Sequence, residues 1–155
     1  MSEDTILKLI EGRWYLQYSG SPLWSKEDVS KVTFNYKLLH RGETLVLEDK
    51  VEYMKNGKMR FRLGYDYPVE DIPMTFKWKG VGVNRFYRNR FEVTILTAEY
   101  MVMFFEKTIT SPTSIDILTR NKTITEEFKN QIFKDISENQ TVKEFLGNIE
   151  KVTQN

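Results

Sequence analysis

The residues best suited to bind a ligand are aromatic side chains, with one methionine, in stretches of alternating apolar and polar residues. Residues two apart share one face of a β-strand, so these side chains could line a common apolar surface. Large rings bury an apolar molecule well, and a tyrosine hydroxyl can bond to a polar group on it. The candidate ligand-binding residues are Tyr18, Trp24, Phe34, Tyr36, Tyr53, Phe61, Phe76, Trp78, Phe91 and Met103. They could instead pack solidly against one another, and the pattern leaves both outcomes open.

Catalytic and metal-binding chemistry has little support in this sequence. His40 is the only histidine and there is no cysteine, which excludes a histidine-based zinc site, a thiolate site and a cysteine nucleophile. Neither a glycine-rich phosphate-binding loop nor a Gly-x-Ser-x-Gly motif is present. We predict no catalytic residues, no bound metal and no cofactor. An enzyme is the alternative, and it would need a polar pair inside the fold, such as Tyr36 with Glu48 or Asp49.

The balance of charge gives no global attraction for nucleic acid. Lysine and arginine number 23 and aspartate and glutamate 22, for a formal net charge of +1. One local run interleaves cations with aromatic rings, as surfaces that bind single strands do. It comprises Lys77, Lys79, Arg85, Phe86, Tyr87, Arg88 and Arg90. We interpret this run as an outward strand face followed by a turn, and we predict no nucleic-acid partner.

The apolar runs are too short to span a bilayer, so we predict no integral membrane segment. The first four residues are polar or acidic after the initial methionine, unlike a secretory signal, and there is no cysteine. We therefore expect a cytoplasmic protein, or a secreted one if a signal peptide has been removed. The length of 155 residues predicts one domain over residues 1–155, which we expect to be a monomer or weak dimer.

Eight stretches between residues 12 and 120 have the period-two pattern of β-strands, and turn-forming segments separate most of them. The first stretch places Trp14, Leu16 and Tyr18 on one face. Asn56-Gly57 is a strong signal for a β-hairpin. On the return strand, the residues expected on the apolar face are Met59, Phe61, Leu63 and Tyr65.

The spacing changes to that of a helix near the C-terminus. Phe128, Ile132, Phe133 and Ile136 predict an amphipathic helix, with Thr125 as its N-cap. Eight consecutive strands with one apolar face each could form a sandwich or a closed barrel, and closure is favoured because it removes exposed strand edges. We predict an all-β fold, an eight-stranded antiparallel up-and-down barrel, with the C-terminal α-helix packed on its outside. A barrel of this size can hold one small ligand.

Three segments, in the right order, resemble the signatures of the lipocalin family. Gly12-Arg13-Trp14-Tyr15 resembles the Gly-x-Trp element of the first strand. Residues 97–100 resemble the Thr-Asp-Tyr connection, although the acidic residue is displaced by one position. Residues 117–127 resemble the last strand, its arginine and the start of the outer helix. The resemblance spans residues 9–154, but the cysteines that tether the C-terminal segment in many secreted members are missing.

The resemblance implies structural roles for Gly12, Trp14 and Arg120, with Trp14 closing the narrow end of the barrel and Arg120 lying across its ring. It also implies a pocket at the other end, rimmed by the loop that carries Trp24. The expected function is the binding or transport of a small hydrophobic ligand: a fatty acid, retinoid, pigment or similar lipid. An enzyme of the same fold, and a protein-interaction module with a packed barrel, are the alternatives.

Overall fold

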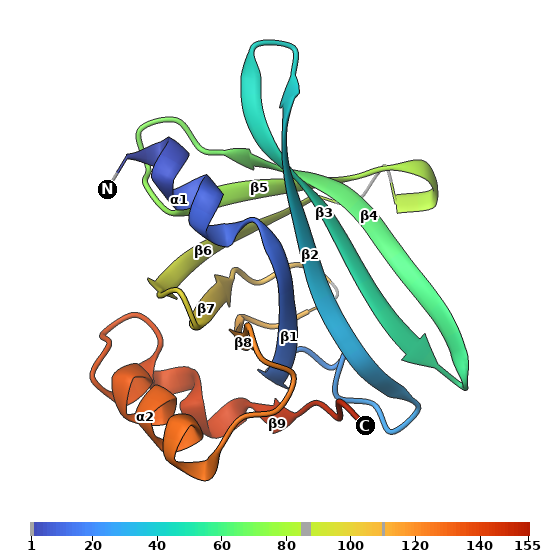
Figure 1. Ribbon diagram of the computed structural model, residues 1–155, viewed down its shortest axis with the longest axis vertical. Helices are drawn as coiled ribbons and strands as arrows, with labels where there is room; N and C mark the ends of the chain where they lie inside the picture. The colour runs from blue at the N-terminus through green and yellow to red at the C-terminus, as the bar shows by residue number, and fades with distance from the viewer. Residues whose placement is uncertain (1, 85–87, 110) are drawn as a thin grey trace.

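The computed structural model describes residues 2–84, 88–109 and 111–155, which form an antiparallel β-barrel with two α-helices against it (Figure 1). The predicted basic run lies partly outside these residues, at Arg85, Phe86 and Tyr87. Two short 3₁₀ helices occupy Gly82–Asn84 and Lys143–Asn148. The other elements, in chain order, are α1 (Glu3–Ile10), β1 (Gly12–Ser19), β2 (Val29–Arg41), β3 (Thr44–Lys55), β4 (Lys58–Pro68), β5 (Thr75–Gly80), β6 (Arg88–Leu96), β7 (Tyr100–Phe105), β8 (Ser114–Thr119), α2 (Glu126–Ser137) and β9 (Glu150–Lys151).

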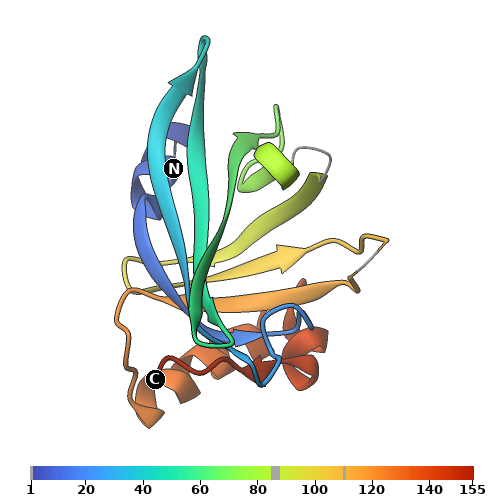
Figure 2. The same ribbon diagram turned by 90° about the vertical axis from the view of Figure 1, so that its right-hand side faces the viewer.

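The barrel closes because β1 pairs with both β2 and β8. Each of the strands β2 to β8 pairs with its neighbour in the chain, which confirms the predicted up-and-down order of eight strands. Trp14 lies opposite Phe34 on one side of β1, and Leu16 lies opposite Leu118 on the other. The two-residue strand β9 adds to the edge of β1 near the C-terminus. The β2–β3 hairpin extends beyond the rest of the barrel (Figure 2).

Trp14 closes one end of the barrel. Its side chain is fully buried, and its indole Nε1–H donates to the Ile10 carbonyl at 2.7 Å. The Arg120 guanidinium carbon lies 3.6 Å from the centre of the indole ring, a cation–π contact. Gly12 has a φ of +113°, and a Cβ there would stand 2.7 Å from an Arg120 nitrogen. Only glycine combines that backbone angle with room for the arginine.

Helix α1 covers the same end. It begins at an N-cap, where the Ser2 hydroxyl accepts from the Thr5 amide at 3.2 Å. Its apolar stripe of Ile6, Leu7 and Ile10 is buried in the same core as Trp14. The stripe and the indole thus seal this end of the barrel against water.

Helix α2 packs on the outside of β7 and β8, as predicted. Ile132 and Ile136 are fully buried against Val102 of β7 and Ile117 of β8. Thr125 is the N-cap, since its hydroxyl accepts from the Phe128 amide at 3.0 Å. The outer faces of β7 and β8 are apolar because this helix covers them.

The prediction that Tyr18 points into the barrel is wrong. A bulge in β1 lies between Leu16 and Tyr18, where the pairing with β8 shifts by one residue. One extra residue in a strand exchanges its two faces. Tyr18 therefore lies on the outside, where its ring meets that of Phe133 from α2 at 5.2 Å, and Ser19 takes the inward place.

The apolar face predicted for β4 is also wrong. Phe61 is 61% exposed, and Lys50 lies over its ring at 4.9 Å on the outer surface. Gly64 and Asp66 are instead the buried residues of this strand. Alternation alone fits either face of the strand. Gly64 takes an inward position because the Trp78 ring fills the space that a side chain at this position would need.

Candidate ligand-binding site

A cavity of about 960 Å³ occupies the barrel at the end opposite Trp14. Rings and apolar side chains from β2, β3, β5, β6 and β7 form its walls. The loop between β1 and β2 and the loop between β7 and β8 contribute to its rim. The wall residues are Phe34, Tyr36, Asp49, Val51, Arg62, Trp78, Asn89, Phe91, Met103, Phe105, Ser114 and Asp116. This volume is at the upper end of the range for small-molecule sites, so the barrel is not packed solid.

Trp24 lies over the cavity on the β1–β2 loop. It is only 6% exposed, and its ring meets those of Tyr53 at 5.1 Å and Phe34 at 6.5 Å. The Arg62 guanidinium lies 5.9 Å from the same ring. The loop reaches back into the barrel because its largest apolar residue would otherwise be left in water.

The structure brings six of the ten predicted ligand-binding residues to the cavity: Trp24, Phe34, Tyr36, Trp78, Phe91 and Met103. Two other predicted residues, Phe76 and Tyr53, do not line the cavity but pack against residues that do. Phe76 stacks on Phe91 with ring centres 5.4 Å apart, and Tyr53 packs against Trp24. Tyr18 and Phe61 lie on the outer surface, away from the cavity.

Three carboxyl groups inside the barrel were not among the predicted ligand-binding residues. Asp49, Asp66 and Asp116 are 6%, 0% and 2% exposed. Burial raises the pKa of Asp49 to about 6 and that of Asp116 to about 7. Burial, and then the charge of Asp49, raise the pKa of Asp66 well above its ordinary value. The available signal was Asp49 itself, which alternates with apolar Leu47 and Val51 on one strand face.

Tyr36 lies among these carboxyl groups. It is the register partner of Asp49, and its hydroxyl donates to the Met103 sulfur at 3.6 Å. Burial raises the pKa of Tyr36, and the charges of Asp49, Asp66 and Asp116 raise it further. Of the two polar pairs considered for an enzyme, the structure therefore places Tyr36 with Asp49 inside the barrel.

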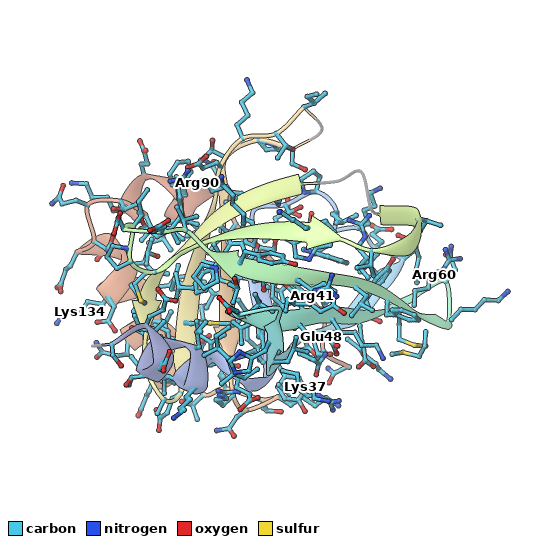
Figure 3. All side chains as sticks on the ribbon, turned by 90° about the horizontal axis from the view of Figure 1, so that it is seen from above. Lys37, Arg41, Glu48, Arg60, Arg90 and Lys134 are labelled. Atoms are coloured by element: carbon cyan, nitrogen blue, oxygen red, sulfur yellow. The ribbon has the colours of Figure 1, made fainter. Side chains whose placement is uncertain are left out.

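Three of the described cations, Arg60, Arg90 and Lys134, come from separate elements of the fold, β4, β6 and α2. Figure 3 shows Arg60, Arg90 and Lys134 at widely separated places. In the predicted basic run, Lys79 lies over the Tyr67 ring at 4.8 Å, and Arg90 pairs with Glu106 at 3.4 Å. Lys79 and Arg90 therefore have contacts within the chain.

Substituting Gly64 with alanine is expected to destabilise the fold by about 1–3 kcal/mol, the usual cost of overpacking. A Cβ there would stand 2.3 Å from the Trp78 Nε1 and 2.7 Å from the Lys79 carbonyl oxygen. The indole must move out of the cavity wall, so tryptophan emission should shift as well as the urea midpoint. Gly147→Ala is the matched control, since nothing lies within 4 Å of its added Cβ. Equal midpoints for the two variants would contradict this placement of Trp78.

No helix within residues 2–84, 88–109 and 111–155 is long and apolar enough to cross a membrane. No family model matches the chain, and a comparison with curated proteins found no match. Solved structures do match it. Lobster apocrustacyanin A1 is similar with a TM-score of 0.67 at 11% identity, over 99% of this chain and 82% of that chain.

Two further solved structures match over nearly their whole length. The siderocalin Ex-FABP has a TM-score of 0.65 at 15% identity, over 95% of each chain. The bovine lipocalin allergen Bos d 2 has a TM-score of 0.63 at 14% identity, over 94% of this chain and 93% of that chain. Together with the closed eight-stranded barrel, the Trp14–Arg120 contact and the outer helix, these likenesses show that the chain has the lipocalin fold.

Proposed function

We propose that this protein binds one small, mostly apolar molecule inside the barrel. The observation that carries the proposal is the cavity of about 960 Å³, whose lining includes six aromatic side chains and whose rim is formed by loops. Burial of apolar ligand surface would supply the affinity, at about 25 cal/mol per Å² before the costs of ordering. The siderocalin with the same fold is described as functioning through dual ligand specificities, which supports ligand binding in general terms.

The finer predictions stay proposals. A fatty acid, a retinoid, a pigment and a similar lipid are the ligand classes predicted from the sequence, with a monomer or weak dimer as the assembly. The compartment is also a prediction, and the lipocalin fold supports the secreted alternative better than a cytoplasmic location. An enzyme would use the inward Tyr36–Asp49 pair, and turnover of a bound ligand would distinguish it from a carrier. The open cavity speaks against the packed interaction module.

A titration with retinol and with naphthylethanol tests the proposal. We expect saturable binding with a dissociation constant in the micromolar range or below, accompanied by quenching of tryptophan emission. Trp78→Ala should weaken binding about tenfold, a change of about 1.4 kcal/mol, because it removes a ring from the cavity wall. Trp24→Ala should act mainly by speeding release, since affinity changes at one site appear mostly in the off-rate.

Phe61→Ala is the matched aromatic control. Its ring lies on the outer surface beneath Lys50, so its truncation should leave both dissociation constants unchanged. Absence of saturable binding across a panel of retinoids, pigments and lipids would overturn the carrier proposal. Equal losses for Trp78→Ala and Phe61→Ala would place the bound molecule outside the cavity.

A further inference from the structure

The inner wall of the barrel carries three acidic side chains with no basic partner. Asp49, Asp66 and Asp116 come from β3, β4 and β8, and each is more than nine-tenths buried. Among the described residues, no lysine or arginine forms an ion pair with any of them. Buried carboxylates are stable only when a charge or hydrogen-bond donors replace their lost hydration. The wall is therefore electrostatically incomplete.

The deficit is concentrated at Asp49 and Asp66. Asp49 lies opposite Gly64 in the β3–β4 ladder, so Asp66 is two residues further along the same face. One oxygen of Asp49 and both oxygens of Asp66 accept no hydrogen bond from any other described residue, and the two carboxyl groups lie close enough to share a proton. The two groups can bond to each other only while one of them keeps a proton. Asp116, in contrast, accepts a hydrogen bond from the Ser19 hydroxyl at 2.5 Å.

We infer that the ligand of this cavity is an organic amine, whose ammonium group binds at Asp49, with Asp66 behind it, while its apolar body contacts the aromatic walls. The inference rests on the proposed function and specifies its ligand class. Asp49 lines the cavity, and one oxygen of its carboxyl group, itself buried, has no hydrogen-bond partner among the described residues. A charge-assisted hydrogen bond there would replace the hydration that burial removed.

The surroundings favour a cation at this position. Trp78 is the register partner of Asp66, and its indole lies over Gly64 and lines the cavity. An ammonium group beside Asp49 would thus also lie near an indole ring, a group whose face attracts cations. A carboxylate headgroup placed beside Asp49 would meet two acids, so a fatty acid fits this position poorly, although Lys26, Arg62 and Lys107 line other parts of the cavity.

A metal ion fits the site less well than an amine. Within the described residues, no three histidine or acidic side chains are arranged to hold a metal. Two carboxyl groups that lie beside aromatic rings instead suit a monovalent organic cation.

Three naphthalene probes of similar shape separate the effect of charge from that of burial: naphthylethylamine, naphthylethanol and naphthylacetate. Titration calorimetry of the full chain at about pH 7.5 measures their dissociation constants. We expect the amine to bind at least tenfold more tightly than the alcohol, and the acetate more weakly than the alcohol. Asp49→Asn should reduce the affinity for the amine to that for the alcohol, while the alcohol binds as before.

Glu48→Gln is the matched control for charge. It removes a carboxylate from the adjacent position of β3, which is not part of the cavity wall, and should leave the order of the probes unchanged. A second measurement needs no variant. Below about pH 6 Asp49 takes up a proton, so the affinity of the wild type for the amine should fall roughly tenfold by about pH 5. The other charged or titratable residues that line the cavity are Lys26, Tyr36, Arg62, Glu106, Lys107 and Asp116. Burial raises the pKa of Asp116 to about 7, so its protonation also contributes to the change.

The outcomes keep the two proposals apart. Saturable binding of the alcohol with no advantage for the amine would overturn the amine inference and leave the carrier function standing. Tighter binding of the acetate than of the amine would overturn it too, as would an amine preference that survives both Asp49→Asn and acidification. If none of the three probes binds, and no member of the wider lipid panel binds either, both the amine inference and the carrier proposal are overturned.

Discussion

Replacing Trp14 with alanine is expected to lower the free energy of unfolding by about 3–5 kcal/mol, the usual cost of truncating a large buried aromatic side chain. The variant loses the packing of a fully buried indole, its hydrogen bond to the Ile10 carbonyl and its contact with Arg120. Urea unfolding followed by circular dichroism measures the change. Phe61→Ala is the aromatic control, and at 61% exposure it should cost less than about 0.5 kcal/mol.

Arg120→Ala should lower the free energy of unfolding by about 2 kcal/mol, because the guanidinium also donates hydrogen bonds to three backbone carbonyls. It donates to those of Leu9 and Glu11 at 2.8 Å and to that of Arg13 at 3.1 Å. The double variant with Trp14→Ala should lose less than the sum of the two single losses, since the groups touch. Simple additivity would show that the cation–π contact contributes nothing. A near-zero loss for Trp14→Ala would contradict the placement of the indole in the barrel core.

The difference in stability between Asp116→Asn and the wild type is expected to shift in favour of the variant as the pH rises. The pKa of Asp116 is about 7 in the fold, against an ordinary 3.8, so the folded protein binds more protons than the unfolded chain between these values. Stability of the wild type therefore falls as the pH rises through this window. The difference between these two pKa values corresponds to about 4 kcal/mol of stability, because one pKa unit is worth about 1.36 kcal/mol. Asparagine cannot ionise, and its amide oxygen can still accept from Ser19.

Urea midpoints at intervals between about pH 4 and pH 8 measure this effect. The curve of the variant should separate from that of the wild type mainly between pH 4 and pH 7. Asp49 and Asp66 act in the same direction, so the variant keeps part of the fall in stability. Glu138→Gln controls for the loss of one carboxyl at the exposed end of α2. Parallel curves for the wild type and Asp116→Asn would contradict the buried position of Asp116.

The order of the elements could be predicted from the sequence because its signals are local. Alternation of apolar residues marked the eight strands, Asn56-Gly57 marked a hairpin, and helical spacing after Thr125 marked α2. Consecutive antiparallel strands leave few ways to remove their edges, so closure followed from their number. The pairing of Trp14 with Arg120 came from the resemblance to lipocalins, since the two residues are far apart in the chain.

The inside and the outside of individual strands were decided only by the tertiary structure. Alternation has a period of two, so it fits both faces of a strand equally until packing selects one. A bulge turned Tyr18 outward, and the Trp78 ring required Gly64 on the inner face of β4, which left Phe61 on the surface. The acidic wall had the same cause. Asp49, Asp66 and Asp116 occupy inward positions because closure of the barrel brings their strands around one cavity, and only Asp49 carried a local signal, its alternation with apolar residues of β3.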